Sequence, residues 1–424
     1  MLTQSVAERE SVKKTKNRKS KKKKWTRPRH AVITRLAYAV LAPYCRWKYG
    51  VAVEKFAAQG DRQYLVVFNH QTAFDQFFVG MAFRGPLYYI ASEDIFSMGF
   101  ISRLLQYAVA PIPIKKQTTD VGAVMNSMRV AREGGSIALA PEGNRTFSGR
   151  NCYMNPAITK LVRKLKLPLA IFRIEGGYGV QPRWCDAPRK GKMRAGVSRV
   201  IEPEEYLALS EEELYERIKQ ELWVDEAVAD AEFRHEKQAE YLERAMYVCP
   251  YCGLSEFESH DDIIACKKCG RQIRYLPTKE LQGVGFDFPY RFVADWYDYQ
   301  CSFVNALDTR LYTQQPLYRD TAALSQVILY KNKKKLQKQV SVALYGDRIE
   351  LEDLASVEGL PAVLPFAELT AVTVLGRNKL NLYWQDRVYQ LKSGKRFNAL
   401  RYVNIFYRAK NSSEGNEHGE FLGL

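Results

Sequence analysis

A short apolar segment followed by a histidine and an aspartate constrains the fold of this chain most strongly. Residues 64–68 (Tyr-Leu-Val-Val-Phe) are apolar, and polar residues precede them. This pattern predicts a short buried strand, and the residues after it predict the first turns of a helix. His70 and Asp75, five positions apart, therefore fall where a strand ends and a helix begins. Ligands of open α/β sheets bind at this edge, although a helix-capping histidine and a solvated acid would explain the same two residues.

The same organisation returns later in the chain. Residues 121–133 have the apolar spacing of an amphipathic helix, and two glycines end it. Residues 136–140 then predict a strand that leads into residues 141–146 (Pro-Glu-Gly-Asn-Arg-Thr). Helix, strand and polar turn in this order indicate parallel strands joined by crossover helices. We therefore expect an α/β domain over residues 50–245, with a sheet flanked by helices.

Other segments of this domain are predicted in the same way. Two prolines in the apolar run 108–114 favour an edge strand or an extended loop. Residues 176–196 have the composition of a basic loop, and the Glu- and Ala-rich residues 203–241 predict helix. The remaining predicted elements are strands at 87–90 and 167–174 and helices at 94–106 and 155–165.

Length and charge indicate several parts with different tasks. A chain of 424 residues is too long for one core, so two or three domains are expected. The net charge is +17, and eleven Lys and Arg without any acid lie between Lys13 and Arg29. Such a run does not fold alone, so residues 1–30 are predicted to be a disordered basic arm. Its partner would be nucleic acid or an anionic membrane surface.

The segment after the arm favours the membrane. In the predicted helix 31–49, residues 31–44 are strongly apolar, and Trp25, Tyr44 and Trp47 flank them. This stretch is shorter than the about 20 apolar residues that a bilayer span needs. A basic arm beside such a segment is typical of an interfacial helix, which would place the protein peripherally on the cytoplasmic face of a membrane. A helix packed on the domain core is the alternative. A long basic region without a small-residue cleavage site argues against a secretory signal.

Four cysteines give the most specific spacing in the chain. Two C-x2-C pairs, thirteen residues apart, let four thiolates converge tetrahedrally on Zn2+ in a zinc ribbon over residues 246–275. A shell of four thiolates has no open position, so this zinc would be structural; His260 lies between the pairs as an alternative ligand. The other four cysteines show no disulfide framework, which favours a reducing compartment. The predicted ligands are Cys249, Cys252, Cys266 and Cys269.

The C-terminal part predicts a small antiparallel sheet. Residues 276–325 are expected to form a helical linker, and period-two runs separated by tight turns follow from residue 326. A final helix is predicted over 396–410, and residues 411–424 are expected to be disordered. Strands followed by one helix resemble a pleckstrin-homology or GRAM-like domain, here at 326–410, which commonly serves membrane or protein docking.

The two polar turns together resemble a known family. Asn69-His70 followed four residues later by Asp75, and then Pro141-Glu142-Gly143 with Arg145, are similar to the N-H-x4-D and P-E-G-x-R blocks of the lysophosphatidate (glycerolipid) acyltransferases. The resemblance covers about residues 50–205. It implies acyl transfer from a thioester, acyl-CoA or acyl carrier protein, to the hydroxyl of a lysophospholipid. The acceptor favoured by this resemblance is 1-acylglycerol 3-phosphate, which would give phosphatidic acid.

The resemblance also implies roles for individual residues. His70 would be the general base, in neutral form beside a helix N-terminus, and Asp75 would orient it. The fork of Arg145 suits a phosphate, helped by backbone amides around Gly143. Glu142 is expected to orient Arg145, or to be a turn residue without a catalytic part.

Two departures from the family bear on the acceptor. A second block that commonly ends in arginine ends here in Lys115 and Lys116, which bind phosphate as point charges without a bidentate fork. In the fourth block Pro168 matches one of the two usual prolines and Ile171 stands near the other. A headgroup other than glycerol phosphate therefore stays open.

Two other classes of function compete with acyl transfer. A catalytically weak lipid-binding module would keep the fold and leave docking to the C-terminal domain. A zinc-ribbon protein associated with nucleic acid would use the basic arm. The ribbon is acidic and lacks an aromatic–basic stacking motif, so no nucleic acid is expected as a partner. A protein partner remains an alternative role for the ribbon or the C-terminal domain.

Overall fold

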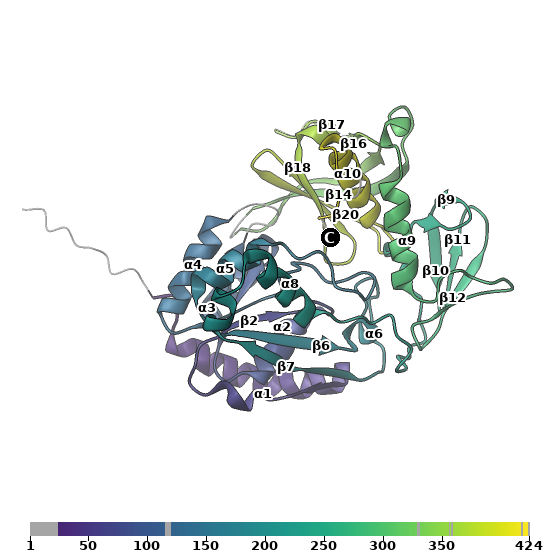
Figure 1. Ribbon diagram of the computed structural model, residues 1–424. Helices are drawn as coiled ribbons and strands as arrows, with labels where there is room; N and C mark the ends of the chain where they lie inside the picture. The colour runs from purple at the N-terminus through teal and green to yellow at the C-terminus, as the bar shows by residue number, and fades with distance from the viewer. Residues whose placement is uncertain are drawn as a thin grey trace, which may run out of the picture.

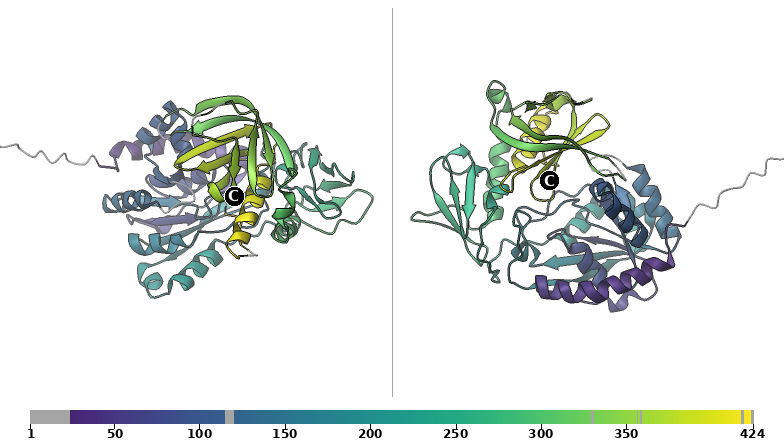
Figure 2. Two further views of the ribbon diagram at one scale, coloured as in Figure 1. Left: turned by 90° about the horizontal axis from the view of Figure 1, so that it is seen from above. Right: turned by 180° about the vertical axis from the view of Figure 1, so that it is seen from behind.

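The computed structural model contains an α/β domain and two smaller β units (Figure 1). It describes residues 24–114, 120–328, 331–355, 357, 359–416 and 419–422. Figure 2 shows the α/β domain on one side and the antiparallel units on the other, with the C-terminal sheet lying over the α/β domain.

The α/β domain is built on a seven-stranded sheet with the order β1-β7-β6-β2-β5-β3-β4. Its neighbours pair in parallel except β6 and β7, which are antiparallel. β4 lies at an edge, as the two prolines of its run predicted. The strands are β1 (Val51–Val53), β2 (Leu65–Phe68), β3 (Leu87–Ser92), β4 (Ile112–Ile114), β5 (Ser136–Leu139), β6 (Leu169–Glu175) and β7 (Met193–Ile201).

Helices cover both faces of this sheet, and the central strand shows why. All four residues of β2 are buried. Val66 and Phe68 pack into one core with α1 and α2, whereas Leu65 and Val67 pack into a second core with α4, α5 and α8. Alternate residues of a strand point to opposite faces, so a continuous apolar strand needs a cover on each side. The helices are α1 (Pro28–Tyr49), α2 (Asp75–Ala82), α3 (Phe100–Ala108), α4 (Val121–Arg132), α5 (Ala157–Leu165), α6 (Gly177–Val180), α7 (Pro203–Leu207) and α8 (Glu211–Leu222), with 3-10 turns η1 (Ala57–Gln59) and η2 (Glu93–Ser97).

The cysteine pairs lie in a small β unit beside a helix. A two-stranded ribbon carries the first pair, and a four-stranded antiparallel sheet in chain order follows. The elements are η3 (Leu242–Arg244), β8 (Val248–Cys249), β9 (Gly253–Leu254), β10 (Phe257–His260), β11 (Ile263–Cys266), β12 (Gln272–Tyr275), β13 (Leu281–Gly283), α9 (Val293–Asn305) and η4 (Thr309–Tyr312).

The C-terminal unit is a seven-stranded antiparallel sheet with one helix against it. Its order is β17-β16-β15-β14-β20-β19-β18, and buried apolar residues of α10 share one core with the strands. The elements are β14 (Tyr318–Val327), β15 (Lys334–Leu344), β16 (Arg348–Glu352), β17 (Val363–Pro365), η5 (Phe366–Glu368), β18 (Leu369–Leu375), β19 (Lys379–Trp384), β20 (Arg387–Ser393) and α10 (Leu400–Ser413).

Several expectations from the sequence are wrong. The predicted helical linker over 276–325 contains strand β13 and the start of β14 beside helix α9, so the C-terminal sheet begins at Tyr318 and not at residue 326. Residues 193–196 belong to β7 and not to a loop, and β7 interrupts the parallel order. Within 203–241 helix ends at Leu222, and the following irregular segment is held by buried tertiary contacts such as the ion pair of Glu226 with Lys279. The tail is not wholly disordered, since α10 continues to Ser413 and Phe421 is only 5% exposed.

Over the part of the chain that the structure describes, each helix is either too short or too polar to cross a bilayer.

Candidate active site

His70 and Asp75 are in direct contact beyond the carboxyl end of β2. The Nδ1 atom of His70 lies 2.8 Å from Oδ2 of Asp75, which is fully buried, while the His70 side chain is 24% exposed. Asp75 is the first residue of α2, and His70 lies five residues earlier in the connecting loop. The helix that the sequence predicts directly after the strand begins only at Asp75, and His70 lies in the loop before it.

Asp75 is fixed by the loop that it closes. Its carboxylate accepts hydrogen bonds from the backbone N–H of Gln71 at 2.6 Å, and from the N–H and hydroxyl of Thr72 at 2.9 and 2.6 Å. A carboxylate at a helix N-terminus is also favoured by the helix dipole. With these donors satisfied, the carboxylate can still accept from the imidazole, so the ring has one preferred orientation.

The neighbours of His70 tie the loop to β6 and α6. Asn69 exchanges two hydrogen bonds of 2.8 Å with the backbone of Ile174. The Gln71 side chain accepts a bond from the N–H of Tyr178 at 3.1 Å. Because Asn69 and Gln71 are both buried, the backbone on each side of His70 is anchored.

Glu142 joins the turn after β5, residues 141–146, to the loop that carries His70. Its carboxylate accepts from the backbone N–H of His70 at 3.2 Å, from that of Cys152 at 2.7 Å and from the amide of Asn151 at 2.9 Å. Burial raises the pKa of Glu142 to about 7, against the lowering effect of these donors. The expectation that Glu142 orients Arg145 is thus wrong: it positions the backbone of His70.

Arg145 is a buried guanidinium without an anionic partner among the described residues. It is 9% exposed, and its Nη1 atom is buried without a hydrogen bond. Burial, followed by the nearby charge of Arg377, lowers its pKa to about 10, and Asp75 acts in the opposite sense. A buried cation normally has a partner, so an anion would be stabilised at this side chain.

The other groups predicted to bind phosphate are the backbone amide of Gly143 and the side chains of two lysines. Gly143 adopts the left-handed region, with φ of 67°, and its N–H donates to the carbonyl of Ala140 at 3.0 Å. That amide is therefore used within the turn and does not face a ligand. Lys115 and Lys116 lie outside the described residues.

The four predicted cysteine ligands converge. Their Sγ atoms all lie within 4.8 Å of one another, and those of Cys249 and Cys269 are 3.9 Å apart. Four sulfurs at about 2.3 Å from a tetrahedral Zn2+ would be about 3.8 Å from each other, so the cluster fits that ion. His260 is outside the cluster: its ring contacts Glu258 and Arg396.

Comparisons with known proteins agree with this geometry in part. Residues 51–175, less than a third of the chain, match the family model described as Acyltransferase. That segment carries both His70 with Asp75 and the Pro141–Arg145 turn, so this part of the chain is an acyltransferase-type domain. A search of curated proteins gives no match.

Solved structures with some likeness fall into two groups. The 1-acyl-sn-glycerophosphate (LPA) acyltransferase PlsC from Thermotoga maritima is 20% identical, over 45% of this chain and 74% of that chain, with a TM-score of 0.36. The N-terminal PH domain of human ARAP2 is 18% identical over 22% of this chain and 81% of its own, with a TM-score of 0.18. The Vps36 N-terminal PH domain is 18% identical over 24% and 82%, with the same score. Scores this low carry no functional meaning.

Proposed function

We propose that this protein transfers a fatty acyl group from a thioester, acyl-CoA or acyl carrier protein, to the hydroxyl of a lysophospholipid. The observation that carries the proposal is the 2.8 Å contact of His70 with the buried Asp75, inside a segment that matches the acyltransferase family model. The acceptor we favour is 1-acylglycerol 3-phosphate, which gives phosphatidic acid.

His70 acts as the general base in this proposal. Asp75 carries no proton to donate when ionised, so the Nδ1–H of His70 donates to it and the lone pair is on Nε2. Nε2 takes the proton of the acceptor hydroxyl as its oxygen attacks the thioester carbon. The acyl–oxygen bond forms, the acyl–sulfur bond breaks, and the imidazolium returns the proton to the departing thiolate. Asp75 stabilises the imidazolium in between.

Arg145 binds the phosphate of the acceptor. Arg145 directly precedes Thr146, whose N–H donates to the carbonyl of His70 at 3.2 Å, and the buried Nη1 of Arg145 has no hydrogen bond. In 1-acylglycerol 3-phosphate the free 2-hydroxyl is next to the carbon that carries the phosphate. A phosphate bound by Arg145 would therefore place this hydroxyl near the His70–Asp75 pair. The planar guanidinium offers two parallel donors to phosphate oxygens. Lys115 and Lys116 remain candidates for the same anion.

An apolar face supports a site of action at a membrane surface. On α1, side chains four residues apart are exposed, among them Leu36 at 65% and Val40 at 72%. On α3, Phe100 is 70% and Leu104 is 52% exposed. The two helices touch, since Arg29 donates to the carbonyl of Tyr107 at 3.0 Å. Adjacent helices with exposed apolar and aromatic side chains beside basic residues suit insertion into an anionic bilayer surface from the cytoplasmic face.

The four cysteines hold a structural Zn2+ in this proposal. Four thiolates complete a tetrahedral shell, so the ion stabilises the small β unit and has no position for substrate.

An acyl-transfer assay tests the proposal. The purified chain is incubated with labelled acyl-CoA or acyl carrier protein and a series of lysophospholipids that differ in headgroup. Transfer to a phosphorylated acceptor, lost in His70→Ala, is the expected result. Absence of transfer to every acceptor would favour a lipid-binding module without catalysis.

A further inference from the structure

The turn between β18 and β19 is the part of the C-terminal unit that contacts the candidate active site. Arg183, only 1% exposed, joins the two: its Nη1 donates to the carbonyl of Arg145 at 2.8 Å. On the other side its Nε donates to the carbonyl of Gly376 at 2.7 Å and its Nη2 to that of Val374 at 3.0 Å. One buried side chain therefore fixes the turn of a distant unit against the residue proposed to bind phosphate.

Arg377 follows Gly376 in this turn and is directed at the same place. Its Nη1 lies 3.3 Å from Oδ1 of Asp186 and its Nη2 lies 3.3 Å from the carbonyl of that residue. Its Nε is buried without a hydrogen bond. Because Arg183 donates to the carbonyls of both Arg145 and Gly376, the turn that carries Arg377 lies beside Arg145.

The charges around Arg377 do not balance. Burial, followed by the nearby charge of Arg145, lowers the pKa of Arg183 to about 9. The carboxylate of Asp186 is shared, because Arg244 also donates to it at 2.7 Å. Four guanidiniums, those of Arg145, Arg183, Arg244 and Arg377, therefore lie in this region, and Asp186 is in contact with two of them. Arg145 and Arg183 are buried, and like charges in such a place are costly without a counter-anion, so the cluster is suited to hold an anion of more than one negative charge.

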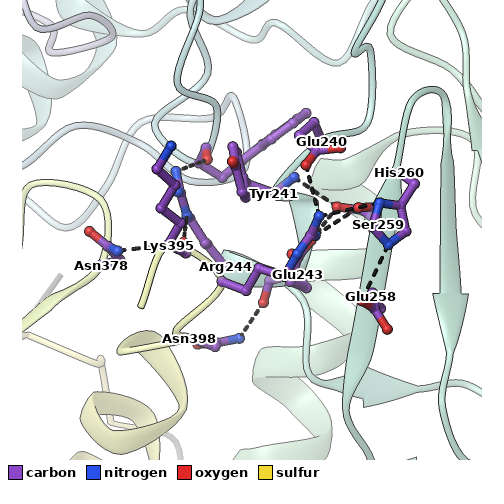
Figure 3. A network of polar contacts seen from close by, with 12 residues as sticks. Glu240, Tyr241, Glu243, Arg244, Glu258, Ser259, His260, Asn378, Lys395 and Asn398 are labelled. Atoms are coloured by element: carbon purple, nitrogen blue, oxygen red, sulfur yellow. Dashed lines mark hydrogen bonds and ion pairs between the residues drawn. The ribbon is translucent and has the colours of Figure 1, made fainter. Parts of the chain in front are cut away.

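The turn is ordered from its outer side as well (Figure 3). Arg244 donates through Nε to the carbonyl of Lys395 at 2.6 Å and through Nη1 to that of Trp184 at 2.8 Å. Asn378 donates to the carbonyl of Gly394 at 2.9 Å, and Asn398 to that of Glu243 at 2.8 Å. Asn378, which follows Arg377 in the turn, is therefore held in place, and a turn that is ordered before the ligand arrives loses little freedom on binding.

We infer that Arg377 and Arg145 together bind the phosphate monoester of the acyl acceptor, so that the C-terminal unit helps to select the substrate. This inference rests on the proposed function, which it deepens. A phosphate monoester carries close to two negative charges near neutral pH, whereas a phosphodiester headgroup carries one. Two guanidiniums that act on one anion therefore favour acceptors with a terminal phosphate over zwitterionic and neutral lysolipids.

Calorimetric titration of the full-length protein tests the inference without requiring catalysis. The probes are a short-chain lysophosphatidate below its micellar concentration, the monoacylglycerol that lacks its phosphate, and acyl-CoA. Loss of a charged donor in a closed site should weaken lysophosphatidate binding to Arg377→Ala roughly 10- to 100-fold. Arg377→Lys should recover part of this loss, and monoacylglycerol and acyl-CoA should bind as to the wild type.

Two variants separate anion binding from docking of the C-terminal unit. Asp186→Asn removes the carboxylate that Arg377 contacts but keeps the guanidinium, so lysophosphatidate should bind at least as tightly as to the wild type. Arg319→Ala removes a 55%-exposed arginine of the same unit, paired with Glu352, and should change nothing.

Several results would overturn the inference. One is that Arg377→Ala binds lysophosphatidate as tightly as the wild type, and another is that Asp186→Asn weakens this binding as much as Arg377→Ala does. The inference also fails if Arg377→Ala weakens only the binding of acyl-CoA, or if the wild-type protein does not prefer lysophosphatidate to monoacylglycerol. Arg377-dependent binding by a protein that transfers no acyl group would instead refute the proposed function and leave this inference standing.

Discussion

The carboxylate of Glu142 accepts a hydrogen bond from the backbone N–H of His70 at 3.2 Å, and the N–H of Thr146 donates to the carbonyl of His70 at 3.2 Å. The turn after β5 therefore binds both the N–H and the carbonyl of His70 in the loop after β2. Since β2 and β5 are adjacent parallel strands, their carboxyl ends deliver the two turns to the same edge.

Glu142 should make stability depend on pH. Its pKa rises from 4.5 to about 7 on folding, so between these values the folded protein binds more protons than the unfolded chain. Stability should therefore fall as pH rises from about 4.5 to 7, by at most about 3 kcal/mol because water reaches part of the group. Thermal unfolding across this range should show the fall, and Glu142→Gln should flatten it. An equal slope in the variant would contradict this account.

Asp75→Asn should damage catalysis more than folding. The amide has nearly the shape of the carboxylate, but it brings an N–H group toward Gln71, Thr72 and His70, which all donate to this position. We expect acyl transfer to fall about 100-fold or more, with a loss of about 1–3 kcal/mol in stability. Initial rates and thermal unfolding measure the two effects. Full activity would show that Asp75 does not orient the base.

The exposed face of α1 should determine binding to membranes. Val40 is 72% exposed on this face, and Val363 on β17 is 44% exposed at a distant place in the chain. Val40→Asp should reduce sedimentation with anionic vesicles several-fold, because the charge opposes insertion of the apolar face. Val363→Asp is the matched control and should sediment as the wild type does. Equal binding by both variants would argue against an interfacial role for α1.

The cysteine cluster should hold one zinc ion for each chain. Elemental analysis should find this ratio in purified protein, and Cys252→Ser should lose the ion and unfold at a lower temperature. Cys301→Ser alters a cysteine of α9 outside the cluster and should keep the zinc. Full zinc content in Cys252→Ser would show that the four thiols are not the ligands.

Features set by nearby residues could be predicted from the sequence. The strand at 65–68 and the approach of His70 to Asp75 depend on one apolar run and on the short loop 69–74. The convergence of the cysteines depends on tight turns with short spacing. Both are local consequences of residue type and position.

Features set by distant contacts could not be predicted. β7 contains charged residues and a glycine, so its composition resembles a loop, and only its pairing with β6 and β1 makes it a strand. Arg377 is one residue of a tight turn in the sequence. Its place beside Arg145 depends on how the C-terminal unit docks, through Arg183 and Asp186, more than 190 residues away in the chain. The partners of Glu142 were missed because Asn151 and Cys152 lie in an irregular segment.

The rate of acyl transfer by His70→Ala tests the central claim most directly. His260→Ala is the matched control, since His260 is 64% exposed in the β unit with the cysteines and should be dispensable for transfer. With labelled acyl donor and lysophosphatidate, removal of the general base should lower the rate about 100- to 10,000-fold. His260→Ala should keep the wild-type rate, and both variants should unfold near the wild-type temperature. Transfer by folded His70→Ala at the wild-type rate would contradict the proposed mechanism.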